Sequence, residues 1–126
     1  MIVTIRAAAI AGLGLLSLSV CPALSDDDFP IIGTYTRDTA CTPASAARAD
    51  LVVRITREQI DSHLGVCRIV SRTREDRFIA AHVECKVPGA NQPILGDVTF
   101  TLRDDKTIAF EDQDHTSDAI LHQCSG

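Results

Sequence analysis

Residues 98–110 read VTFTLRDDKTIAF, and this stretch decides the fold class. Apolar side chains occupy every second position from Val98 to Leu102, which is the period of a β-strand with one buried face. Asp104-Asp105-Lys106 then provides a short polar turn, and the alternation resumes from Ile108 to Phe110. The stretch therefore predicts two antiparallel strands joined by a tight hairpin.

The segments on either side repeat this pattern. Phe78–Val87 places Ile79, Ala81, Val83 and Cys85 on one face and is followed by a turn sequence, Pro88-Gly89-Ala90-Asn91. Two segments remain open: 42–48 between a helical turn and a loop, and 58–61 between a short strand and a helical turn. Further strands are expected over 31–36, 51–56, 66–73 and 118–124.

Seven or eight short strands with short connections predict an all-β fold, in which a small antiparallel meander closes into a barrel or sandwich. The chain has one Tyr, four Phe and no Trp. We therefore expect a modest, mainly aliphatic core, to which disulfides add stability.

The first 25 residues have the layout of a signal peptide. Arg6 is followed by an uncharged, apolar run from Ala7 to Val20, and Ala23-Leu24-Ser25 supplies small residues for cleavage after Ser25. The run is too short for a membrane anchor. Cys21 would be lipid-modified in a lipoprotein, but Val20 stands where such sites have Gly, Ala or Ser. We expect residues 26–126 to form a single β domain that is periplasmic or secreted.

Four cysteines remain after this cleavage: Cys41, Cys67, Cys85 and Cys124. An even number in a short exported chain predicts two disulfides, and the wide spacings differ from those of a zinc site. If the two central strands pair about Asp76, Cys67 faces Cys85. The same register places Ile69 opposite Val83, and Ser71 opposite Ala81. Cys41 is then left to pair with Cys124.

Charge excludes some classes of partner. Residues 26–126 carry a net charge of −6, and the arginines are scattered. This favours solubility and gives no electrostatic footprint for nucleic acid or an anionic membrane.

The polar residues form no recognisable catalytic or metal motif. The histidines stand apart; the chain contains no HExxH, HxH or GxSxG sequence, and its histidines are His63, His82, His115 and His122. Residues 111–115 with Asp118 are the densest acidic patch, yet the Gly and distal Glu of a calcium loop are missing. We predict no catalytic residues, no metal ligands and no cofactor. A metal-dependent enzyme using His82, His122 or Asp112 and Asp114 is the weakest alternative.

Arginines cluster around the central hairpin. Arg68, Arg72 and Arg74 share strand parity, with Arg77 nearby, so they would line one face as a basic stripe. Such a stripe would receive an acidic partner. The alternative is that these charges guard an exposed sheet against edge-to-edge pairing.

The order of these features carries a resemblance. Gly33-Thr34-Tyr35, then Cys41, Cys67 and Cys85, the Leu/Asp/Lys hairpin and the terminal Cys124 resemble small exported, largely uncharacterised β-domain proteins of Gram-negative bacteria. The Gly-x-Tyr opening strand is also similar to that of lipocalin-like barrels and of periplasmic inhibitors of lysozymes or proteases. The resemblance implies a periplasmic β domain and assigns no activity.

The expected function is a non-catalytic binding module, of inhibitor type or otherwise, for an unknown protein or small ligand. We expect a monomer that recognises its partner through the loops 88–97 and 111–117, because rigid scaffolds usually carry function on loops. The alternative is a carrier with an apolar barrel interior, which requires a cavity.

Overall fold

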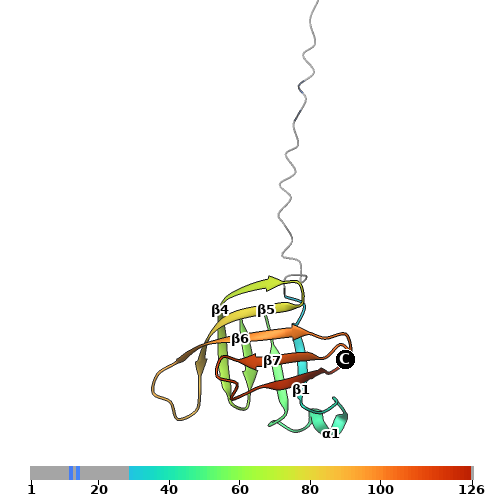
Figure 1. Cartoon of the computed structure of the whole chain (residues 1–126), viewed down its shortest axis with the longest axis vertical. Coiled ribbons are helices and arrows are strands. Elements are labelled where there is room, and N and C mark those ends of the chain that lie inside the picture. Colours follow the sequence, from blue (N-terminus) through green and yellow to red (C-terminus); the bar gives the residue numbers. More distant parts are fainter. Residues whose placement is uncertain (1–11, 13, 15–28, 126) are drawn as a thin grey trace, which may run out of the picture.

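The computed structural model describes residues 29–125 together with Gly12 and Gly14; apart from these two glycines, the predicted signal peptide lies outside the described residues. Eight antiparallel strands close into a barrel in sequence order, with β8 pairing with β1 (Figure 1). The prediction of an all-β meander is confirmed, and the barrel is the correct alternative. The strands are β1 (Gly33–Arg37), β2 (Val52–Ile55), β3 (Gln59–Ser62), β4 (Gly65–Glu75), β5 (Phe78–Lys86), β6 (Ile94–Leu102), β7 (Ile108–Asp112) and β8 (Ala119–Gln123).

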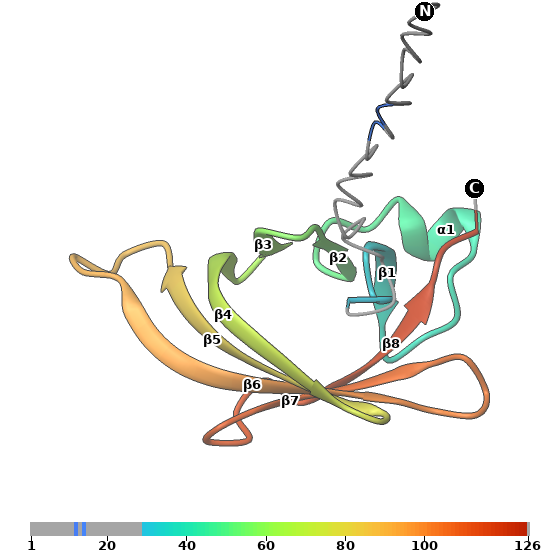
Figure 2. The ribbon, with the colours of Figure 1, turned by 90° about the horizontal axis from the view of Figure 1, so that it is seen from above.

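Both segments left open by the sequence now have a definite structure. The only helix in the described residues is α1 (Pro43–Ala46), whose N-cap Thr42 exchanges hydrogen bonds with Ser45. The segment 58–61 falls in strand β3. Figure 2 shows the β1–β2 connection with α1 on the outside of the barrel. This connection covers Thr36 of β1, whose side chain faces outward and is nevertheless fully buried. The Thr36 hydroxyl donates a hydrogen bond to the Thr39 carbonyl.

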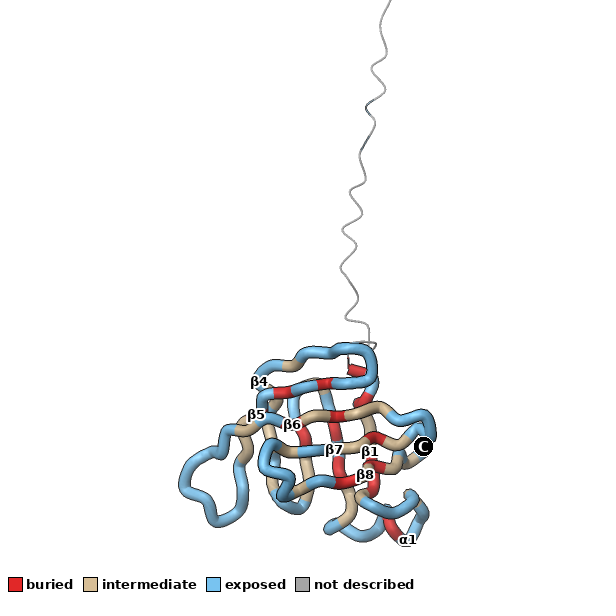
Figure 3. Tube along the Cα trace, viewed as in Figure 1, coloured by how far each residue is buried: buried red, intermediate tan, exposed pale blue. Residues whose placement is uncertain are grey.

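The core follows the alternation of the strands. On β5, Ile79, Ala81 and Val83 point inward and are buried, whereas Ala80 and His82 between them are exposed. Figure 3 shows these short buried segments interrupted by exposed ones along the strands. Period-two patterning therefore directs apolar side chains into the barrel from all sides.

The β4–β5 hairpin pairs Cys67 with Cys85 and Ile69 with Val83, as predicted. The predicted pairing of Ser71 with Ala81 is wrong: a β-bulge between Ile69 and Ser71 inserts one residue, and Ser71 lies opposite His82. The hairpin then turns at Asp76 and Arg77.

The bulge also separates the arginines. Arg68 pairs with Glu84 on the outer face and forms an ion pair with it, whereas Arg72 and Arg74 lie opposite the inward-facing residues Ala81 and Ile79. The predicted basic stripe is therefore wrong, because one extra residue reverses the facing of every residue beyond it.

The meander has two ends. At one, which we call the floor, the segment 29–32 enters from outside the strands and packs Phe29 and Ile31 into the interior. Tyr35 is also buried here, and its hydroxyl donates to the Ile31 carbonyl at 2.8 Å. Burial raises the pKa of Tyr35 to about 12. The guanidinium of Arg72 stacks over the Phe29 ring at 4.6 Å. The core is mainly aliphatic, as expected, and two of its few aromatic side chains, Phe29 and Tyr35, lie at the floor.

Both predicted disulfides are present. Cys41–Cys124 ties the β1–β2 connection to the end of β8, and Cys67–Cys85 links β4 to β5. Two disulfides in so small a domain indicate an oxidising compartment outside the cytoplasm.

Candidate functional site

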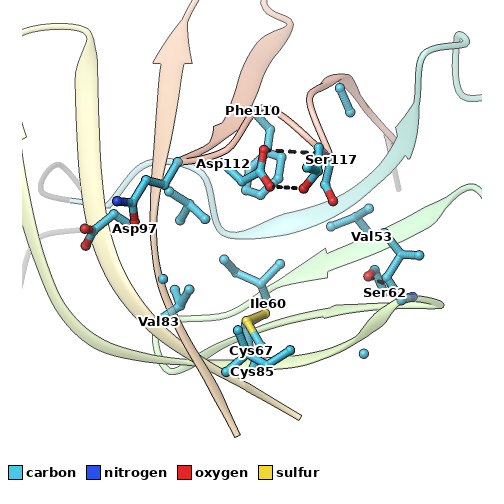
Figure 4. Close-up of a pocket in the computed structure, with 18 of the residues that line it drawn as sticks. Val53, Ile60, Ser62, Cys67, Val83, Cys85, Asp97, Phe110, Asp112 and Ser117 are labelled. Atoms are coloured by element: carbon cyan, nitrogen blue, oxygen red, sulfur yellow. Dashed lines mark hydrogen bonds between the residues drawn. A yellow bond between two sulfur atoms is a disulfide. The ribbon is translucent and has the colours of Figure 1, made fainter. Parts of the chain in front are cut away.

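The opposite end of the barrel is hollow. A cavity of about 320 Å³ opens between the connections β1–β2, β3–β4, β5–β6 and β7–β8. Its walls are mainly apolar side chains that the strands direct inward, among them Val53, Ile60, Val83 and Phe110 (Figure 4). The volume is in the range of sites that hold small organic molecules.

Two features of the wall leave this space empty. The Cys67–Cys85 disulfide forms part of the wall (Figure 4). Two cysteines fill less of the interior than two large apolar side chains at the same positions would. Gly96 of β6 occupies an inward position opposite Val83 but has no side chain, and a Cβ placed there would meet no atom within 4 Å. A glycine inside a strand commonly marks a place where a ligand approaches closely.

An apolar lip extends the cavity into solvent. It consists of four residues beside the cavity with exposed side chains: Leu64, Val87, Ile94 and Leu95. Leu95 lies opposite Glu84 and alternates with the inward Gly96, so its side chain, 76 % exposed, is on the outer side of the lip. All four come from the β3–β4 turn and the β5–β6 hairpin, which reaches beyond its neighbouring strands in Figure 2. Exposed apolar side chains that lie next to one another often mark a binding site for a ligand or a protein.

Gly65 holds the lip in position. Its φ is +145°, and a Cβ at this residue would lie 2.3 Å from the Lys86 carbonyl oxygen. Only glycine allows the start of β4 to approach the end of β5 so closely. Leu64 and Val87 are therefore kept at one side of the opening.

The other side of the opening is polar and is formed by the loop 113–118. The two carboxylate oxygens of Asp112 accept hydrogen bonds from the Thr116 hydroxyl at 2.6 Å and the Ser117 amide at 3.1 Å. The Thr116 hydrogen bond is the main reason that the pKa of Asp112 is lowered. Asp112 therefore stays ionised and fastens the loop over the cavity.

His115 and Asp118 add a second fastening within the same loop. His115 Nδ1 lies 2.9 Å from Asp118 Oδ2, and this hydrogen bond raises the pKa of His115. Both side chains are exposed, so the pair is screened by water.

The two loops singled out from the sequence, 88–97 and 111–117, meet at this open end. Their boundaries need correction, because 94–97 already belong to β6 and 111–112 to β7. The sequence did not reveal Arg37 or Leu64 as parts of the same opening, and it did not show which way Gly96, within 88–97, faces. Only the pairing register shows that Gly96 faces inward.

The four histidines lie apart, in the β3–β4 turn, on β5, in the loop 113–118 and on β8. Within the described residues no group of three His, Cys, Asp or Glu side chains is placed to hold a metal ion. Asp112, one of the two candidate calcium ligands, has both oxygens engaged with its own loop.

A serine, a histidine and an aspartate form a row on the outer face of three adjacent strands. Ser71 lies opposite His82, and His82 Nδ1 contacts Asp97 Oδ1. In Figure 4 Asp97 points away from the cavity. Among the hydrogen bonds of residues 29–125 there is none between Ser71 and His82, so the row does not form the nucleophile–base pair that acyl transfer requires.

Comparison with known proteins finds no family model, no curated protein and no solved structure that matches this chain. Within the described residues, no helix has the length and apolar character needed to cross a membrane.

Proposed function

We propose that the protein is an exported, non-catalytic binding protein, periplasmic or secreted, that takes a small and mostly apolar ligand into the open end of its barrel. The observation that carries this proposal is the cavity of about 320 Å³ with its mainly apolar wall. An eight-stranded barrel is just wide enough either to be filled by its own side chains or to hold one small ligand.

The distribution of small residues supports the ligand-holding alternative. Gly96 and Ala119 stand at inward positions beside the cavity, where larger residues would close it. Burial of apolar ligand surface against this wall contributes roughly 25 cal/mol per Å² to the free energy of transfer from water. Leu64, Val87 and Ile94 of the lip enlarge the apolar surface available to the ligand.

Gly96→Leu is a direct test, since its side chain would project into open space in the cavity. The probe is N-phenyl-1-naphthylamine, an uncharged apolar dye whose fluorescence rises on leaving water. We expect the wild type to bind one dye per chain and Gly96→Leu to weaken binding at least tenfold, about 1.4 kcal/mol. Thermal unfolding should be unchanged or shift slightly upward.

Ala80→Leu is the matched control. Ala80 is exposed on the outer face of β5, so the variant adds a side chain of the same size outside the barrel. It should bind the dye like the wild type. Absence of dye binding by the wild type, or equal binding by Gly96→Leu, would overturn the proposal.

Recognition of a protein by the lip is the second candidate function, favoured by the exposure of Leu95. An inhibitor-type contact made by the lip would survive Gly96→Leu, because that substitution changes the cavity and not the exposed side chains around it. The same variant therefore separates the two functions.

A further inference from the structure

Three polar side chains project from the strands into the cavity: those of Arg37, Ser62 and Asp112. Ser62 Oγ accepts a hydrogen bond from the Leu64 amide at 3.2 Å, and Asp112 accepts two from its loop. Within residues 29–125, Arg37 is the one of the three whose side chain has no hydrogen bond or ion pair. Arg37 is therefore a cation at the cavity wall without a paired carboxylate among the described residues, although Asp112 and Asp114 lie on the same wall.

The direction of Arg37 follows from the register of β1. Tyr35, two residues earlier, points inward and is buried, and Arg37 lies opposite the buried Leu121 of β8. Arg37 is half-buried at the last position of the strand, which places its guanidinium at the cavity rather than on the outer face.

A half-buried guanidinium has a strong requirement for a partner. It remains charged at every physiological pH and presents five N–H donors in a planar fork that fits a carboxylate. Partial removal from water weakens its hydration, so pairing gains more here than at an exposed site.

We propose that the ligand is a single-chain amphiphile whose carboxylate pairs with Arg37 while its hydrocarbon chain lies in the cavity and along the apolar lip. This inference rests on the proposed binding function and specifies its ligand class. The chain length matters: Asp112 and Asp114 also line the cavity and repel a free anion, so the apolar chain must supply most of the affinity.

The test uses three twelve-carbon compounds that differ only in the end group: dodecanoate, dodecanol and dodecylamine. Each displaces N-phenyl-1-naphthylamine from the protein at pH 8. We expect wild type to bind dodecanoate about tenfold more tightly than dodecanol, as one charge-assisted pair supplies. Acetate, which has the carboxylate without the chain, should not displace the dye.

Arg37→Met keeps an apolar stem of similar length and removes the charge. It should abolish the preference for dodecanoate over dodecanol and leave dodecanol binding unchanged. Arg54→Met is the control, because Arg54 is exposed on the outer face of neighbouring β2 and its loss changes the net charge equally. This variant should keep the preference.

The outcomes separate this inference from the proposed function. If none of the three compounds and no dye binds, the proposed function fails. If dodecanol or dodecylamine binds as tightly as dodecanoate, or if the preference survives Arg37→Met, apolar binding stands and the carboxylate inference is overturned.

Discussion

The floor and the open end of the barrel are built from the same eight strands, yet one is filled and the other is hollow. At the floor, Phe29 and Ile31 enter from a segment outside the strands and are buried together with Tyr35, all at most 2 % exposed. At the open end the inward positions carry Gly96, Ala119 and a disulfide, and the loop 113–118 covers them only partly.

This difference teaches that the number of strands does not decide whether such a barrel has a cavity. The size of the inward side chains decides it, together with any segment that enters from outside the sheet. A binding site at one end then requires a well-packed end elsewhere, because close packing supplies most of the stability of a small domain.

Removal of a floor side chain should have the largest effect on stability. Phe29→Ala leaves a void under Arg72 and is expected to lower the free energy of unfolding by about 3–5 kcal/mol in urea titrations. The control is Phe78→Ala, which removes a ring that is 54 % exposed on the outer face, and its effect should stay within about 0.5 kcal/mol. Equal effects of the two substitutions would show that the floor is not the stabilising end.

Removal of the Cys67–Cys85 disulfide should lower the free energy of unfolding by less, and should change the folded structure only at the open end. The bridge closes a sequence separation of 18 residues, so the Cys67→Ala/Cys85→Ala variant is expected to lose roughly 3 kcal/mol in the chain-entropy model. Tyr35 is the only tyrosine and the chain has no tryptophan, so its intrinsic fluorescence reports on the floor.

Under conditions where it is folded, the Cys67→Ala/Cys85→Ala variant should keep the Tyr35 signal of the wild type. Its dye binding should weaken, since the disulfide lines the cavity. A changed Tyr35 signal in the folded variant would mean that the two ends do not pack independently.

The strands could be predicted because most inward positions alternate cleanly, as from Val98 to Leu102. The cysteine pairing also followed from one hairpin register, supported by Ile69 opposite Val83. Both depend on local periodicity, which sequence shows directly.

The bulge at Val70 could not be predicted, because the residues 70–75 contain no apolar alternation that would reveal a shift of register. Phe29 was missed as a floor residue, since three aspartates and a proline surround it and suggest exposed chain. The cavity was left as an open alternative for a related reason. Whether Gly96 faces inward or outward depends on its pairing with Val83, and the sequence around it gives no sign of this.

Acid should loosen the loop 113–118 at the open end before it affects the floor. Its effect on the free energy of unfolding should be smaller than that of Phe29→Ala or of removing the disulfide. The folded-state pKa of Asp112 is lowered, chiefly by the Thr116 hydrogen bond. Asp112 therefore stabilises the fold above its unfolded pKa of about 4, and this contribution is lost as the pH falls through the lower, folded-state pKa. His115 has the opposite sign: its raised pKa gives a contribution that is present below about pH 6.5 and is lost as the pH rises through the folded-state value.

The variant Asp112→Asn tests the part of this pH dependence that comes from Asp112. At pH 6 the variant should be less stable than the wild type by about 0.5–1 kcal/mol, a small value because water screens this carboxylate. The difference should shrink as the pH falls through the folded-state pKa of Asp112 and the wild-type carboxylate takes up its proton. Asp50 and Asp105 also have lowered pKa values and remain in both proteins, so they cancel in this comparison. A difference that stays constant from pH 6 down to the acid unfolding of the wild type would show that the shape of the side chain, and not its charge, holds the loop over the cavity.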